Sequence, residues 1–268
     1  MGLDLITQRN CEVKTEIPQK ELLNQIKNRN RAYSVYNMLI NDGKTIVESL
    51  NTEFTYQLQT LEGLKNETLK VSTLISQTSF LEPLGNKCNN CIVSQNKPFG
   101  CIGFVSYPIS EQCEIWLASL AESANKKGIP YSTSIIFIKD QKINGNRIKQ
   151  MRIQGQTFFE ANQPKEIILS KSFFKKDTIT TDQLFDITFL NGLMQTTHIN
   201  YLLMLYGGVV SDTSKPNNKP SKLNSENNKY VYLDLDLPNN ADKSITEFYN
   251  YFHHLFIALI NGHDVLMD

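Results

Sequence analysis

The stretch YVYLDLDL (residues 230–237), followed by ITEFYNYFHHLFIAL (residues 245–259), decides the fold class of this chain. In the first segment leucine alternates with aspartate, and this period of two predicts a β-strand. The second segment predicts an amphipathic helix whose apolar stripe consists of Ile245, Phe248, Phe252, Leu255, Phe256 and Leu259. One strand and one helix cannot enclose a core alone, so we expect both to pack on the rest of the chain.

The preceding residues predict more strands and helices, in no regular order. The predicted helices cover residues 19–28, 32–40 and 181–207, and a further helix is capped by Ser110. The predicted strands lie at residues 54–58, 69–71, 135–138 and 167–169, and Asn144-Gly145 predicts a hairpin turn into residues 147–153. This order predicts an α+β fold, with a mostly antiparallel sheet packed against several helices.

Two segments of the sequence predict irregular structure instead of helices or strands. Residues 86–107 contain most of the cysteines together with Pro98, Gly100 and Gly103, and they predict an irregular Cys-rich loop. Residues 211–228 are almost entirely polar and lack the apolar area that ordering requires, so they predict a flexible polar loop. We expect both loops to be excursions from a single α+β domain over residues 1–268.

Charge and hydropathy bear on location and partners. Lys plus Arg and Asp plus Glu both total 27, so no global field favours nucleic acid or a membrane surface. Residues 187–210 contain no charged side chain, but Asn191, Gln195, His198 and Asn200 favour a buried amphipathic helix over a membrane span. The first ten residues lack the apolar core of a signal peptide, which predicts a cytoplasmic protein.

The cysteine cluster is the most informative chemical feature of the sequence. Cys88 and Cys91 form a Cys-x2-Cys pair, and Cys101 and Cys113 follow within 25 residues of Cys88. A Cys-x2-Cys turn lets two thiolates converge on one ion, and Gly100 gives the backbone freedom to add Cys101. We therefore predict a zinc site with Cys88, Cys91, Cys101 and Cys113 as ligands.

Several alternatives to this site stay open. Cys113 shares a helical face with Trp116, Leu117 and Leu120, so it is either the fourth ligand or a core residue. A closed four-thiolate site is structural, whereas a site completed by histidine, carboxylate or water keeps catalysis open. Free thiols, disulfides and iron–sulfur chemistry are the other readings, and a thiol near a helix N-terminus, such as Cys113, could be a nucleophile.

Three weaker groups complete the candidates. Asp234 and Asp236 project from one face of a predicted strand and could hold Mg²⁺, although half-buried strands give the same alternation. One side of the predicted helix could line a pocket with Asn191, Gln195 and His198. A basic group that could meet phosphate, or form a solvated hairpin tip, consists of Lys139, Lys142, Arg147, Lys149 and Arg152.

These features predict a non-catalytic protein, stabilised by zinc, that binds another macromolecule as a regulatory or accessory subunit. Its expected partner is a protein. The alternative is an enzyme that uses the region from Cys88 to Cys113, either as a metal-dependent hydrolase or as a cysteine-based catalyst. The sequence identifies neither the substrate nor the partner, and it leaves the oligomeric state undetermined.

Overall fold

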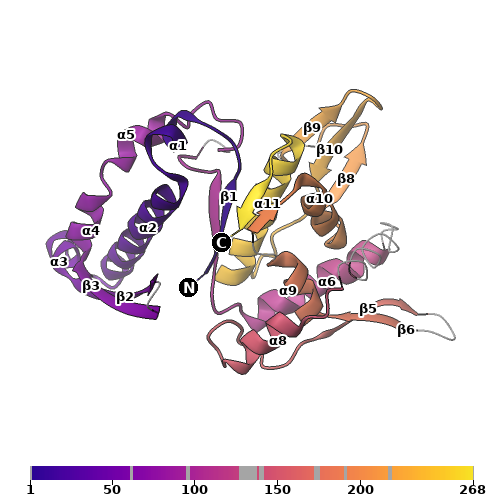
Figure 1. Ribbon diagram of the computed structural model, residues 1–268, viewed down its shortest axis with the longest axis horizontal. Coiled ribbons are helices and arrows are strands. Elements are labelled where there is room, and N and C mark those ends of the chain that lie inside the picture. Colours follow the sequence, from indigo (N-terminus) through magenta and orange to yellow (C-terminus); the bar gives the residue numbers. More distant parts are fainter. Residues whose placement is uncertain are drawn as a thin grey trace. The chain divides into compact units, whose positions relative to one another are not determined.

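The computed structural model describes residues 2–60, 63–94, 97–126, 138, 142–171, 176–189, 192–216 and 219–267. These residues form two compact units (Figure 1). The first unit comprises Asn10–Gly100, and the second combines Gly2–Arg9 with Cys101–Asp268. The single domain expected over residues 1–268 stays a prediction.

The first unit is organised around the long helix α2 (Gln19–Asn41), whose buried residues include Leu22, Leu23 and Ile26. We predicted two helices here, but no glycine or proline separates them and they form one. The other elements of this unit are α1 (Glu12–Glu16), α3 (Ile46–Asn51), β2 (Glu53–Thr60), β3 (Gly63–Lys70), α4 (Val71–Gln77) and α5 (Leu81–Asn86). Strands β2 and β3 pair antiparallel and contain the strands predicted at residues 54–58 and 69–70.

The second unit contains a four-stranded sheet in which neighbouring strands are all antiparallel, in the order β4-β1-β11-β7. Its strands are β1 (Gly2–Thr7), β4 (Ile102–Ser106), β7 (Gly192–Met194) and β11 (Val265–Met267). Helix α11 (Lys243–Ile260) packs against β4. Its buried face includes Phe248, Phe252, Leu255 and Phe256, as the apolar stripe predicts.

Among the described residues, four more helices and a hairpin enclose the core of the second unit. The elements are α6 (Glu111–Lys126), α8 (Asn146–Ile153), α9 (Thr181–Thr188), α10 (Thr196–Leu205), β5 (Glu166–Lys171) and β6 (Lys176–Thr180). Aromatic rings pack against one another in this core, with Phe185 between Phe159 at 5.0 Å and Phe189 at 5.4 Å, measured between ring centroids. Antiparallel sheets and helices in irregular order confirm the α+β class.

The single helix predicted over residues 181–207 is wrong. Helix α9 ends at Thr188, strand β7 follows, and α10 begins at Thr196. Gly192 has a φ of 96°, a conformation that a helix does not allow, and it lies where the chain turns into β7. The N-cap of α9 is Thr180, and its capping box is completed by Gln183.

The hairpin predicted at Asn144-Gly145 is also wrong, because residues 146–153 form helix α8. Gly145 does have the positive φ, 76°, that the turn signal implies. However, the Asn144 side-chain oxygen accepts a hydrogen bond from the backbone N–H of Asn146, at 2.9 Å, and the turn leads into a helix instead of a strand. The strand predicted at 135–138 lies, except for Ile138, outside the described residues.

Both segments predicted as irregular contain strands. Strand β4 lies within residues 86–107. Residues 211–228 contribute to a second sheet of the second unit, ordered β8-β10-β9, with β8 (Val209–Asp212), β9 (Ser221–Asn224) and β10 (Lys229–Leu233). Within the described part of the chain, no helix has the length and apolar character needed to cross a membrane.

Candidate functional site

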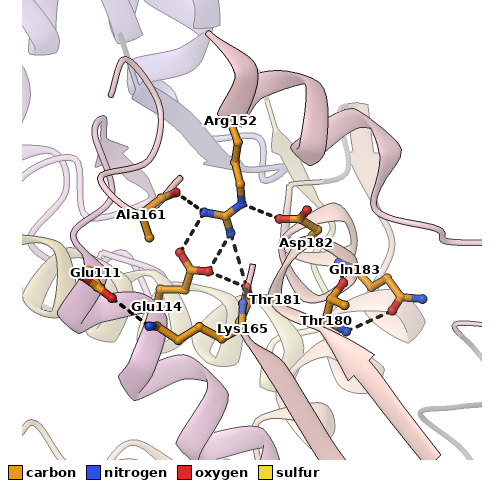
Figure 2. A network of polar contacts seen from close by, with 9 residues as sticks. All are labelled: Glu111, Glu114, Arg152, Ala161, Lys165, Thr180, Thr181, Asp182 and Gln183. Carbon is orange, nitrogen blue, oxygen red and sulfur yellow. Dashed lines mark hydrogen bonds and ion pairs between the residues drawn. The ribbon is translucent and has the colours of Figure 1, made fainter. Parts of the chain in front are cut away.

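The largest buried group of charges in the second unit centres on Arg152. Helix α8 carries this residue, and its side chain is only 3% exposed. The Nε–H donates to Asp182 Oδ1 at 2.6 Å, and two further N–H groups donate to the carboxylate of Glu114, at 2.6 and 3.1 Å (Figure 2). A third partner is the backbone carbonyl of Ala161, at 2.7 Å. This forked geometry is the one that guanidinium groups make with carboxylates.

Local structure explains why Glu114 and Asp182 point inward. The Ser110 hydroxyl accepts a hydrogen bond from the Cys113 N–H at 3.1 Å and caps α6, so that Cys113 and Leu117 face the core and Glu114 lies beside them. Asp182 lies in the first turn of α9, where a negative charge interacts favourably with the helix dipole.

Thr181 joins this charged group to the hairpin. Its hydroxyl donates to Glu114 Oε1 at 2.5 Å and accepts the backbone N–H of Lys165 at 2.9 Å (Figure 2). The backbone N–H of Thr181 in turn donates to the Lys165 carbonyl, at 2.9 Å. Helices α6, α8 and α9 and the start of β5 are therefore connected through one hydrogen-bonded network.

Burial lowers the pKa of Arg152, but its hydrogen bonds to Glu114 and Asp182 outweigh that effect, and the pKa is raised above its ordinary value. The guanidinium also lies 4.5 Å from the centre of the Phe159 ring. The donors are thus directed at partners within the chain. A cation held in this way is suited to fixing helices in place and not to meeting a substrate.

The predicted zinc ligands fall into both units. Cys88 and Cys91 belong to the first, whereas Cys101 and Cys113 belong to the second. All five cysteines lie among the described residues, and none forms a disulfide. The described residues contain no group of three or more His, Cys, Asp or Glu side chains placed to hold a metal ion. The four-cysteine site stays a prediction.

Cys113 contacts the apolar core. It is 0% exposed, and the same cluster of buried residues includes Leu117 and Phe252. Burial raises the pKa of its thiol well above the ordinary value, and the nearby carboxylates of Asp242, Glu114 and Glu247 add to that effect. A thiol in this position is suited to packing, because its thiolate is strongly disfavoured.

The remaining predicted groups have other partners. The ammonium group of Lys219 lies 2.8 Å from a carboxylate oxygen of Asp234 and 3.5 Å from one of Asp236. The pocket predicted on one helix cannot be assessed as a set, because Asn191 lies outside the described residues. In the basic group, Arg152 is buried and Arg147 pairs with Asp186 at 3.0 Å.

Sequence reasoning missed an apolar surface on the three-stranded sheet. Side chains alternate along β10, so Val231 and Leu233 face the core whereas Tyr230 and Tyr232 face away from it. Opposite the two tyrosines in the pairing lie Val210, Asp212, Ser221 and Leu223. We call these six residues the outer face.

The outer face combines aromatic and apolar side chains with access to solvent. Leu223 is 45% exposed, and Tyr230, Tyr232 and Val210 are half-buried. Alternation between Tyr230 and Leu233 was visible in the sequence and predicted a strand. Because β8 and β9 were read as a polar loop, the sequence did not show that a sheet would carry these tyrosines.

Comparison with protein-family models, with curated proteins and with solved structures finds no match to this chain.

Proposed function

We propose that this chain is a non-catalytic protein that acts by binding another protein through the outer face of its three-stranded sheet. The observation that carries the proposal is the position of Tyr230, Tyr232 and Leu223 on the side of β9 and β10 that faces away from the core. Tyrosine is enriched at protein interfaces, because its ring buries a large area at low entropic cost and its hydroxyl can pair with the partner.

The charge network supports a structural role for the most buried ionisable groups. Arg152 directs its donors at Glu114, Asp182 and Ala161, and these contacts connect elements of one unit. A binding protein needs such a rigid frame behind its contact surface, since order in the free protein lowers the entropic cost of association. Zinc at Cys88, Cys91, Cys101 and Cys113 stays a separate prediction and is not part of this proposal.

A double variant tests the proposed surface. L223S/Y230S removes the two side chains that lie opposite each other on β9 and β10. The matched control is Ile153→Ser, which changes an apolar residue that is 78% exposed and lies on α8 of the same unit. Cross-linked partners of the wild-type chain and of both variants are then quantified by mass spectrometry, and circular dichroism checks that each variant is folded.

We expect a defined set of partner proteins to be recovered with the wild-type chain and with Ile153→Ser, and to be lost with the folded L223S/Y230S variant. Retention of the same partners by the double variant would show that the outer face is not the binding surface. Turnover of a substrate by the purified chain would contradict the non-catalytic part of the proposal.

A further inference from the structure

Residues 88–94 of the first unit form two successive tight turns around the Cys-x2-Cys pair. The backbone N–H of Cys91 donates to the carbonyl of Cys88 at 3.0 Å, and that of Ser94 donates to the carbonyl of Cys91 at 3.0 Å. The Ser94 hydroxyl lies within hydrogen-bond distance of both carbonyls, 3.0 Å from Cys88 and 2.7 Å from Cys91. The backbone that carries the two thiols is therefore held in place.

This turn brings the two cysteines within reach of a disulfide. A hydrogen bond from residue i+3 to residue i closes a turn whose end Cα atoms lie less than about 7 Å apart. Disulfides join Cα atoms separated by roughly 4.4–6.8 Å. Cys88 and Cys91 are the ends of such a turn, and both are thiols in the structure.

The two thiols differ in access. Cys88 is buried, with 6% of its surface exposed, whereas Cys91 is only half-buried. In thiol–disulfide exchange, an accessible thiol attacks the external disulfide, and a second thiol beside it then resolves the mixed disulfide. The accessible Cys91 and the buried Cys88 fit these two roles.

A third thiol lies nearby, on Cys11, the N-cap residue of α1. Lys87, which directly precedes Cys88, bridges Glu12 at 2.7 Å and also pairs with Glu16. These contacts hold the start of α1 beside the turn. Cys11 is therefore a competing partner for Cys88, and the test has to distinguish a Cys11–Cys88 disulfide from a Cys88–Cys91 disulfide.

We propose that Cys88 and Cys91 form a thiol–disulfide exchange pair that reacts with low-molecular-weight disulfides of the glutathione type. The Cys91 thiolate attacks one sulfur of the external disulfide and forms a mixed disulfide with it. The S–S bond of the external disulfide breaks, and its other half leaves as a thiol after taking up a proton. The Cys88 thiolate then attacks the Cys91 sulfur of the mixed disulfide and displaces the second thiol. The two protein thiols are oxidised to one disulfide while one external disulfide is reduced to two thiols.

This reaction is independent of the proposed partner binding, because the outer face belongs to the other unit. The test uses the full chain. Reduced protein is equilibrated with mixtures of reduced and oxidised glutathione, quenched with acid, alkylated and mapped by mass spectrometry. Metal content is measured on the same sample, and circular dichroism confirms that the protein remains folded.

In the wild-type chain we expect a Cys88–Cys91 disulfide without a lasting glutathione adduct. Cys88→Ser should accumulate a stable adduct on Cys91, whereas Cys91→Ser should lose the internal disulfide. Cys11→Ser, which removes the third thiol of the same unit, is the matched control and should form the Cys88–Cys91 disulfide as the wild type does.

Three results would overturn the proposal, and all three are measured on the wild-type chain. They are a glutathione adduct that persists on Cys91 of the folded wild-type chain, a disulfide between Cys11 and Cys88 in place of the expected one, and protection of both thiols by a bound metal ion. A protein that loses partner binding but still forms the Cys88–Cys91 disulfide would leave this proposal intact.

Discussion

At the residue scale, Arg152 shows how a buried cation is accommodated in this protein. Glu114 is 0% exposed and Asp182 is 5% exposed, so the guanidinium lies between two carboxylates that are themselves removed from water. Taking such charges out of water costs several kcal/mol each, and only their mutual hydrogen bonds offset that cost. Removing one member therefore leaves the others without compensation.

We expect Arg152→Ala to lower the free energy of unfolding by about 3–5 kcal/mol, because it leaves Glu114 and Asp182 buried without their cation. The matched control is Lys165→Ala, which breaks an ion pair with Glu111 whose side chains are 34% and 57% exposed. That change should cost less than about 1 kcal/mol. Urea unfolding measures both values, and similar costs for the two variants would show that the buried network contributes little.

A second residue-scale prediction concerns alkaline pH. Burial raises the pKa of Tyr107 to about 12, with a smaller opposing effect from Arg147. Because the pKa in the folded state lies above the ordinary value, the tyrosine contributes its full stabilisation below about pH 10 and loses it as the pH rises towards about 12. The loss amounts to about 2–3 kcal/mol.

Tyr107→Phe removes this proton and keeps the ring, which packs edge-on against Phe158 at a centroid distance of 5.2 Å. Compared with the wild type, the variant should therefore unfold at a higher pH when alkaline unfolding is followed by circular dichroism. Tyr206 and Tyr251 are present in both proteins, so their titration cancels in the comparison. Identical midpoints would place the Tyr107 hydroxyl in contact with water.

At the scale of elements, the sequence predicts best where the pattern is local. Helix α11 follows from its own apolar stripe, and the β2–β3 hairpin follows from its own alternation. The three-stranded sheet could not be predicted in this way, because β8 and β9 are only four residues long each and are stabilised by pairing with β10. The ion pairs of Arg152 could not be predicted either, because its partners Glu114 and Asp182 lie 38 and 30 residues away in the chain.

The turn that carries the cysteines depends on one close approach of the backbone. A Cβ atom on Gly100 would lie 1.8 Å from the carbonyl oxygen of Ser94. Because a backbone oxygen cannot rotate away, Gly100→Ala should displace the turn and lower the free energy of unfolding by more than about 3 kcal/mol. The sequence predicted flexibility at this glycine, and the structure assigns it a steric role.

Gly43→Ala is the matched control for this element. Gly43 has a φ of 84°, but an added Cβ would meet nothing within 4 Å. Its substitution should cost only about 1–2 kcal/mol, from backbone strain. Urea unfolding ranks the two variants, and a Gly100→Ala protein as stable as Gly43→Ala would show that the turn around Ser94 adjusts easily.

At the scale of the whole molecule, the described part of the chain crosses between the two units twice, after Arg9 and after Gly100. Cooperative unfolding units follow the distribution of contacts, so each compact unit is expected to open separately. The single domain predicted from the sequence implies the opposite behaviour, because a shared core would unfold as one. The polar composition of residues 211–228 does not indicate whether the chain unfolds as one domain or as two units. The boundaries between the units lie elsewhere, after Arg9 and after Gly100.

Hydrogen exchange measured by mass spectrometry distinguishes separate opening of the two units from unfolding as a single domain. Gly100→Ala perturbs the first unit, and we expect it to raise amide exchange in α2 while α11 keeps its protection. Arg152→Ala perturbs the second unit and should do the reverse, because the Arg152 network connects only elements of that unit. If either variant raises exchange equally in α2 and α11, the two units unfold as one cooperative structure and the single-domain prediction is right.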